Sequence, residues 1–224
     1  MVRDGVLYGT VSSEGENTQG VVFKVNTDGS GYEVLHAFSD PYYTHDGANP
    51  SNSTLAYADG QLYGSTSSGG TNGCGTVYTV GTGGDNYRVV FGGFTGAGEE
   101  VIGGYPEASV VLSADKSTLY GVTTWANAPG AYGTVFSVGT DGQNFTVLHS
   151  FNDSNYGGTG YDGISPYGTL TLSGGKLYGM TNAGGLHDGG TLFALQVDGS
   201  DFTVLHPFGD PDAINGPDGI YPCG

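Results

Sequence analysis

A unit of about 57 residues recurs four times along the chain, and this repetition limits its fold more than any other feature. The tripeptide Leu-Tyr-Gly marks each unit and returns at intervals of 55, 57 and 58 residues. A block of the type Gly-Thr-Val-Phe follows it, and another aromatic residue comes nine residues after that block. We therefore predict a single domain over residues 1–224, with repeats at approximately 1–45, 46–101, 102–161 and 162–217, and with 218–224 starting a further repeat.

Each repeat has the pattern of β-strands and shows no sustained helical period. Segments such as 191–196 and 202–208 are rich in β-branched and aromatic residues and largely alternate between apolar and polar positions. Turns with glycine, such as Asp141-Gly142 and Asp198-Gly199, separate these segments, because glycine permits the positive φ of a tight hairpin. We therefore predict four antiparallel strands in each repeat.

Radially repeated four-stranded sheets are the blades of a β-propeller, and we predict an all-β chain of this class with four antiparallel blades. The first blade lacks most of its innermost strand, since only Val2 stands where later repeats have Tyr57 and Leu172. A linear β-solenoid is the alternative. Two arrangements of the chain ends remain open: four blades close into a ring, or the chain is a piece of a longer array whose open edges pair with another chain.

The charge balance excludes two classes of partner. The 224 residues include 22 Asp and Glu against 5 Lys and Arg, which gives a formal net charge of −17 at pH 7. Binding to phosphate backbones needs clustered Lys and Arg, so no nucleic acid partner is expected. No apolar run approaches the roughly 20 residues of a membrane span, so no direct membrane insertion is expected.

Several fixed blocks recur in the same order in the repeats. These are Asp-Gly-x-x-Pro, the segment Gly-Lys-Leu-Tyr-Gly-Met-Thr-Asn-Ala-Gly-Gly at 175–185, Gly-Gly-Thr-Leu-Phe at 189–193 and a Val-Leu-His-x-Phe strand. Together they resemble the Gloeo-Verruco (GloVer) repeat family of exported bacterial β-propeller-like proteins. The resemblance covers essentially the whole chain. It implies an extracellular or cell-surface location of the bacterial type, and it brings no established catalytic residues.

Residues that recur in the repeats are interpreted as structural, and residues that break the repeat as functional. His36, His149 and His206 all occupy the Val-Leu-His strand, so we expect packed and hydrogen-bonded strand residues. The tyrosine of Leu-Tyr-Gly is expected in the core at four positions: Tyr8, Tyr63, Tyr120 and Tyr178.

Acidic loops suggest a metal site. The densest stretch is 210–218, and Ca²⁺ prefers the carboxylate, amide and carbonyl oxygens that such a loop offers. Two interpretations stay open: a calcium site, or turns in which each Asp accepts hydrogen bonds from nearby backbone amides. The predicted calcium ligands are Asp210, Asp212, Asn215 and Asp218.

Copy-specific aromatic residues gather in loops that a propeller would place on one rim. The only Trp of the chain, Trp125, lies in a loop of repeat 3 where the other copies have Ser, Asn and Gly. Aromatic faces can stack on sugar rings while carboxylates and amides bind the hydroxyls, so we predict a glycan site, with packing against a neighbouring blade or subunit as the other interpretation. The predicted ligand-binding residues are Trp125, Tyr132, Asn127, Tyr42, Tyr43, His45, Tyr161, His187 and Asp188.

The chain has two cysteines, Cys74 and Cys223. Both are expected on the same rim of a propeller, which makes them a candidate disulfide pair. Sequence alone cannot give the distance between them.

The sequence favours a non-catalytic binding or scaffolding module at the cell surface, whose partner is a glycan or a protein. It contains no Gly-x-Ser-x-Gly elbow and no zinc-binding spacing. One alternative is a structural self-assembly unit, a homo-oligomer completed by strand pairing between chains. Another is a carbohydrate-active hydrolase or lyase, which would use a pair of carboxylates, although 22 acidic residues make such a pair easy to find by accident.

Overall fold

The computed structural model describes residues 1–13, 19–39, 45–50, 54–95, 102–125, 132–152, 161–212 and 218–222. These residues form strands, turns and loops and contain no helix. The part of the chain that the structure describes accordingly has no helix that could cross a membrane. The prediction of an all-β chain is confirmed.

The first two repeats contribute nine strands. Each strand begins and ends as follows: β1 (Val2–Arg3), β2 (Val6–Val11), β3 (Val21–Asn26), β4 (Glu33–Ala37), β5 (Gly47–Pro50), β6 (Ala56–Ala58), β7 (Gln61–Gly69), β8 (Thr76–Gly81) and β9 (Arg88–Phe91).

The last two repeats contribute eight strands. Their bounds are β10 (Val111–Leu112), β11 (Thr118–Thr123), β12 (Thr134–Gly139), β13 (Thr146–Ser150), β14 (Ile164–Ser173), β15 (Lys176–Ala183), β16 (Thr191–Gln196) and β17 (Thr203–Pro207).

Each repeat forms one antiparallel sheet whose strands lie in the order of the sequence. In repeat 2 the innermost strand is divided into β5 and β6, which both pair with β7. In repeat 4 it is the continuous strand β14. In repeat 1 it is only the two-residue β1, which confirms that the first blade lacks most of this strand.

The Leu-Tyr-Gly motif fits the centre of each sheet because its glycine leaves room for an aromatic ring. Gly121 lies opposite Phe136 in the register of β11 and β12, and a Cβ on Gly121 would stand 2.5 Å from that ring. The other three sheets repeat the arrangement. The opposed residues there are Gly9 and Phe23, Gly64 and Tyr78, and Gly179 and Phe193.

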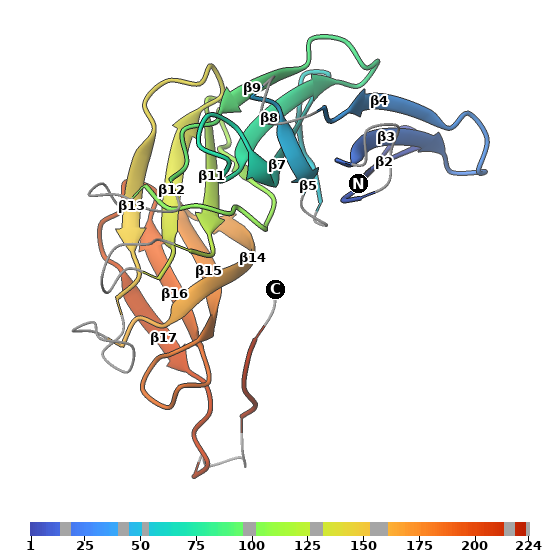
Figure 1. Cartoon of the computed structure of the whole chain (residues 1–224). Coiled ribbons are helices and arrows are strands. Elements are labelled where there is room, and N and C mark those ends of the chain that lie inside the picture. Colours follow the sequence, from blue (N-terminus) through green and yellow to red (C-terminus); the bar gives the residue numbers. More distant parts are fainter. Residues whose placement is uncertain are drawn as a thin grey trace.

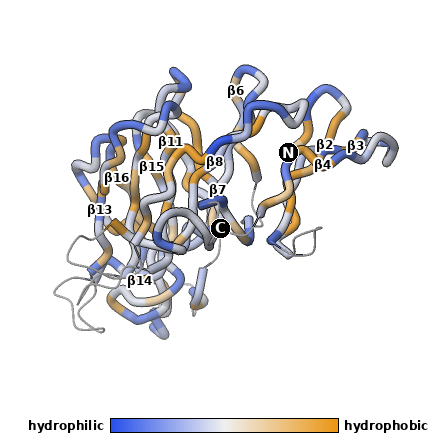
Figure 2. Tube along the Cα trace, turned by 45° about the horizontal axis from the view of Figure 1, so that its top comes forward, coloured by the Kyte–Doolittle hydropathy of each residue, from blue (hydrophilic) through white to orange (hydrophobic). Residues whose placement is uncertain are grey.

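The four sheets follow one another around an arc, with the innermost strands β5 and β14 on its concave side and the last strands β13 and β17 on its convex side (Figure 1). Apolar residues concentrate in the strands of the sheets, and hydrophilic residues concentrate in the turns (Figure 2). This arrangement is that of β-propeller blades, which confirms the predicted fold class.

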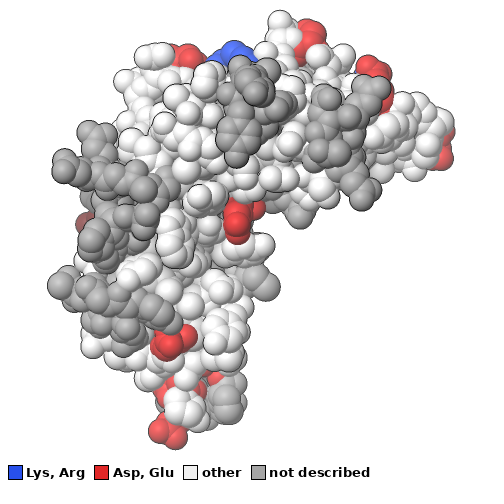
Figure 3. All heavy atoms as spheres, in the orientation of Figure 1, with Lys and Arg blue, Asp and Glu red and all other residues white. Residues whose placement is uncertain are grey.

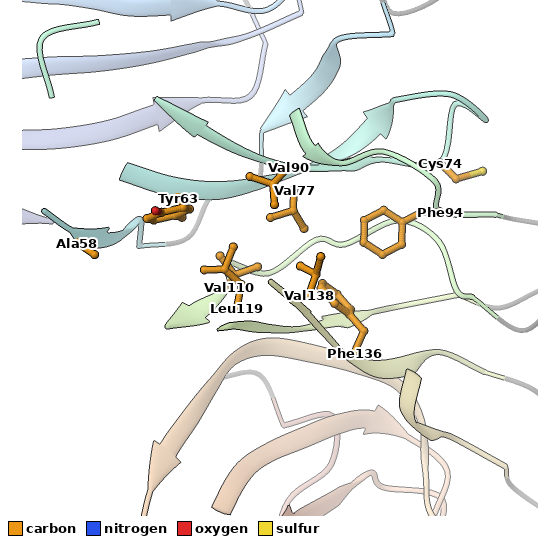
Figure 4. Close-up of a cluster of buried hydrophobic side chains, with 10 residues drawn as sticks. All are labelled: Ala58, Tyr63, Cys74, Val77, Val90, Phe94, Val110, Leu119, Phe136 and Val138. Carbon is orange, nitrogen blue, oxygen red and sulfur yellow. The ribbon is translucent and has the colours of Figure 1, made fainter. Parts of the chain in front are cut away.

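Three hydrophobic clusters hold the arc together, and each lies between two successive repeats. Figure 4 shows the cluster between repeats 2 and 3, in which Phe94 and Val77 from one sheet face Phe136 and Val138 from the next. The described residues include no fourth cluster between repeats 4 and 1.

A short segment with the pattern Asp-Gly-x-x-Pro, here called the lead-in, leads into the innermost strand of a repeat and overlaps the strands β5 and β14. The lead-ins are residues 46–50, 102–106 and 162–166, and residues 218–222 form a fourth one. Repeat 3 has Ile102-Gly103 in place of Asp-Gly. Each lead-in proline packs on a glycine of the preceding repeat. A Cβ on Gly133 would lie 2.4 Å from Cδ of Pro166, and Pro222 packs on Gly190 in the same way.

This contact predicts a large effect for one small substitution. Gly133 has φ +104, and an added Cβ would also lie 2.4 Å from the carbonyl oxygen of Thr123. Gly133→Ala should lower the free energy of unfolding by about 3 kcal/mol or more, because strain at positive φ adds to a clash with backbone. Urea denaturation measures the change.

Gly60→Ala is the matched control, because Gly60 has φ +81 and open space around its Cβ position. That variant should lose only the strain of positive φ, about 1–2 kcal/mol. Equal losses in the two variants would show that the contact with Pro166 does not matter.

Candidate functional site

The three strand histidines each bind an aspartate that opens the following lead-in. His36 Nε2 lies 3.1 Å from Asp46 Oδ2, and His149 Nε2 lies 3.1 Å from Asp162 Oδ2. His206 Nε2 lies 2.7 Å from Asp218 Oδ2. Since each histidine ends the outer strand of one repeat and each aspartate begins the next, these pairs join successive repeats.

The histidine rings are also enclosed by aromatic rings. His36 stacks on Tyr87 of the next repeat with centroids 3.4 Å apart, and its edge meets Phe38. His149 stacks in the same way on Phe202 at 3.6 Å. The side chains of His36 and His149 are only 18% and 17% exposed, which leaves little access for a substrate. The prediction that these are packed, hydrogen-bonded strand residues is confirmed for both.

The contact between repeats 2 and 3 replaces the charged pair by an apolar one. Phe91 takes the place of the histidine and Ile102 that of the aspartate. Phe91 stacks on Phe145 with centroids 4.0 Å apart, and Phe94 meets both rings edge-on. The two substitutions occur together at one contact, so the histidine and the aspartate form a single structural unit.

Asp46 is buried at its contact and carries a perturbed pKa. Burial alone would raise the pKa of this carboxyl, but hydrogen bonds from His36, from the Tyr87 hydroxyl and from the Ser39 backbone N–H lower it to about 2. Burial, and then the Asp46 carboxylate, raises the pKa of Tyr87. The aspartate is therefore ionised at neutral pH and serves as an acceptor rather than an acid.

The predicted calcium ligands lie in hydrogen-bonded turns where the structure describes them. Asp210 Oδ1 accepts the backbone N–H of Asp212 at 2.8 Å, and Asp218 Oδ1 accepts that of Gly209 at 2.8 Å. Asn215 lies outside the described residues. Among the residues that are described, no three His, Cys, Asp or Glu gather closely enough to hold a metal ion. Calcium binding stays a prediction.

Cys74 is buried in the loop between β7 and β8, and its thiol is 3.4 Å from the carbonyl oxygen of Asn72. Its own carbonyl accepts the backbone N–H of Tyr105 in the next lead-in. Cys223 lies outside the described residues, so the disulfide remains a prediction.

Trp125 lines a pocket between repeats 3 and 4 with a volume of about 330 Å³. Two large aromatic side chains in its wall are partly open to solvent: Trp125 is 48% exposed and Tyr167 is 43% exposed. Trp125 follows β11, Tyr167 belongs to β14, and Asn182 belongs to β15. The pocket is lined by Glu107, Thr124, Trp125, Ser165, Tyr167 and Asn182.

Backbone hydrogen bonds fix the two aromatic walls of the pocket. Trp125 exchanges both backbone hydrogen bonds with Gly104 in the lead-in of repeat 3. Tyr167 directly follows Pro166, the proline that packs on Gly133. The contacts between repeats therefore set the separation of these side chains in advance of any ligand.

The other predicted ligand-binding residues do not join this pocket. His45 lines a separate hollow of about 410 Å³ with residues 68–73. Tyr161 is 51% exposed but is not among the described residues of the Trp125 pocket wall. Tyr132 is not among them either, and its carbonyl accepts the Ser165 N–H. Tyr42, Tyr43 and Asn127 lie outside the described residues.

His187 and Asp188 are adjacent in sequence but have different partners. His187 Nε2 is 4.0 Å from Asp210 Oδ2, whereas Asp188 Oδ1 accepts the backbone N–H of Gly184. Asp188 has φ +61, a value common in tight turns.

Sequence analysis missed five lining residues: Glu107, Thr124, Ser165, Tyr167 and Asn182. A signal for two of them was present, because Glu107 and Tyr167 each directly follow a lead-in proline and differ from copy to copy.

The chemistry of the pocket suits an uncharged, hydroxyl-rich ligand. The described residues of the wall offer two aromatic faces, one carboxylate, one amide and hydroxyl groups, and none of them is Lys or Arg. Over the face shown in Figure 3, the whole arc carries scattered acidic side chains and little positive charge. Glu107 is the carboxylate among the described residues of the wall.

Comparison with known proteins gave matches of two kinds. A family model described as Gloeobacter/Verrucomicrobia repeat matches residues 1–223. The chain is similar to a chain of the nidogen/laminin complex, with 16% identity and a TM-score of 0.57 over 91% of this chain and 61% of that one. A comparison with curated proteins gave no match.

Two further solved structures are similar at the level of the fold. Putative TolB from Agrobacterium tumefaciens has 14% identity and a TM-score of 0.52, covering 85% of this chain and 56% of that one. An oligogalacturonate lyase in complex with manganese has 11% identity and a TM-score of 0.54, covering 91% and 50%. This chain spans less than two thirds of each of the three structures, and at these identities the likeness concerns the fold alone.

The electrostatics of Asp46 predict a pH dependence of stability. Its pKa is lower in the folded chain than the ordinary value of 3.8, so its stabilising contribution is complete above about pH 4 and disappears as the pH falls towards 2. Asp46→Asn should cost about 2 kcal/mol of unfolding free energy at pH 6, and the gap to the wild type should narrow between pH 4 and pH 2. Chemical denaturation at each pH measures it.

Asp4→Asn is the control, because it removes the same charge from a side chain that is 88% exposed. Its unfolding free energy should stay close to that of the wild type at every pH. If wild type and Asp46→Asn lose stability in parallel from pH 4 to pH 2, another group is responsible.

Proposed function

The chain belongs to the Gloeobacter/Verrucomicrobia repeat family, and from this premise we propose that it is a non-catalytic binding module that takes a neutral carbohydrate in the Trp125 pocket at a bacterial cell surface. The observation that supports this most is the pair of half-exposed aromatic side chains, Trp125 and Tyr167, in the wall of one pocket. The location rests on the family resemblance.

Aromatic rings that face solvent in a preformed hollow offer flat apolar surfaces to the C–H faces of a sugar ring. A pocket of about 330 Å³ lies at the lower end of the range of small-molecule sites, which fits one or two sugar units. Glu107 can accept hydrogen bonds from hydroxyl groups, and the Asn182 amide can both donate and accept. An acidic wall without Lys or Arg disfavours phosphorylated, sulfated or uronic sugars.

The proposal of binding without catalysis rests on the content of the wall. Both glycosidase geometries use two carboxyl groups on opposite sides of the bond that breaks. Glu107 is the one acidic residue among those that line this pocket. A single carboxylate with polar and aromatic neighbours can orient a sugar, but it lacks the partner that would activate water or form a glycosyl intermediate.

Trp125→Ala and Tyr167→Ala should each weaken binding of a neutral oligosaccharide at least tenfold, because each removes one stacking face. A glycan array with the 224-residue chain identifies the sugar, and titration calorimetry then measures the dissociation constants. Because both side chains are about half exposed, the melting temperature should stay close to that of the wild type.

Tyr161→Ala is the matched control, since Tyr161 is an exposed aromatic residue of the same region that does not line the pocket. It should bind like the wild type. The proposed sugar site would be refuted if Trp125→Ala binds as the wild type does, or if the chain binds no neutral glycan on the array. New reducing ends released from the bound oligosaccharide would refute the absence of catalysis.

A further inference from the structure

Two faces of the described chain carry apolar and aromatic side chains that are more exposed at the ends of the arc than most of their equivalents at the internal contacts between repeats. The N-face consists of Leu7, Phe23 and Tyr32 in repeat 1, and the C-face consists of Leu205, His206 and Phe208 in repeat 4. Leu7 is 37% exposed, whereas its equivalents are fully buried against the preceding repeat. Those equivalents are Leu62, Leu119 and Leu177.

The C-face shows the same contrast. Leu205 is 50% exposed, while its equivalents Leu35 and Val90 are 6% and 7% exposed and Leu148 is partly buried. The His206 side chain is 47% exposed, compared with 17–18% for His36 and His149. Phe208 is half-buried, whereas its equivalents are 0% exposed. These are Phe38, Phe94 and Phe151.

Both faces already have the geometry of an internal contact. Phe23 and Tyr32 have centroids 5.6 Å apart, compared with 5.7 Å for Phe136 and Phe145. On the C-face, His206 meets Phe208 edge-on at 4.8 Å. The corresponding distance between His36 and Phe38 is 4.9 Å. Neither half needs to rearrange in order to form a further contact of this type.

The hairpin turns also show that the position next to repeat 1 is unoccupied by described residues. A Cβ on Gly84, Gly142 or Gly199 would lie 2.6–3.2 Å from the backbone carbonyl of the preceding repeat's outer strand. The equivalent Gly29 in repeat 1 has nothing within 4 Å of its Cβ position. Repeat 1 therefore has room for an outer strand that no described residue fills.

The lead-in 218–222 completes the comparison. Its Asp218 holds His206, the Tyr221 N–H donates to the Gly189 carbonyl, and Pro222 packs on Gly190. The tail thus forms the same contacts as an internal lead-in, but the described residues provide no sheet after it. Repeat 1, conversely, has a sheet but no lead-in among its described residues.

We propose that the C-face of one copy of this chain docks on the N-face of a second copy, head to tail. His206 then stacks on Tyr32, Phe208 packs on Phe23, and the tail of the first copy acts as the lead-in for repeat 1 of the second. The three internal contacts are the template for this interface, because in each of them a ring on the outer strand of one repeat stacks on an aromatic ring of the next repeat. Head-to-tail contacts close into a ring or extend into a filament, depending on the rotation between copies.

The test uses charge substitutions at exposed positions, which should not disturb folding. Tyr32→Lys alters only the N-face and Leu205→Lys only the C-face, at side chains 59% and 50% exposed. Light scattering coupled to size exclusion, over a wide concentration range in about 0.15 M salt, gives the mass of each species. The wild type should exceed 22.9 kDa increasingly with concentration, and each variant alone should stay near 22.9 kDa.

A mixture of the two variants makes the test specific for head-to-tail contact. The intact C-face of Tyr32→Lys meets the intact N-face of Leu205→Lys, so the mixture should form a heterodimer that neither variant forms alone. Tyr161→Lys is the control at an exposed aromatic residue outside both faces, and it should associate like the wild type. The proposal is overturned if the wild type is monomeric throughout, if either variant associates alone, or if the mixture does not associate.

Discussion

The contact between successive repeats is the interaction on which the rest of this structure depends. A sheet of four short strands cannot bury both of its faces alone, so each blade gains its core from its neighbours. The same parts meet each time: a Phe edge, a ring stacked on an aromatic residue of the next sheet, and a proline seated on a glycine of positive φ. In two internal contacts a His–Asp pair completes the set, and in the third Phe91 and Ile102 replace it.

These contacts also place the Trp125 pocket. The lead-in is held by its proline and by a backbone hydrogen bond to the preceding repeat, so the residue directly after the proline has a fixed position. Glu107 and Tyr167 are two such residues, and together with Trp125 they enclose the pocket between repeats 3 and 4. Recurrent residues build the scaffold, and residues that differ between copies at its edge supply the chemistry.

The fold could be predicted from the sequence because four copies of one strand pattern leave few architectures. The role of His36 and His149 could also be predicted, since a recurrent position is a structural one. Their partners could not, because Asp46 and Asp162 lie 10 and 13 residues further on, in another repeat. The pocket could not be predicted either. Glu107 and Asn182 line it together because two sheets pack side by side, and no local sequence motif indicates that packing.

The histidine and the aspartate of a contact act as one unit, and a double-mutant cycle tests this coupling directly. Asp162→Ile alone should cost about 3 kcal/mol of unfolding free energy, because it removes the acceptor of a partly buried histidine. Adding His149→Phe reproduces the Phe91–Ile102 pair and should recover at least half of that loss. If the two changes are additive, so that the double variant is less stable than either single one, the His–Asp unit does not hold the blades together.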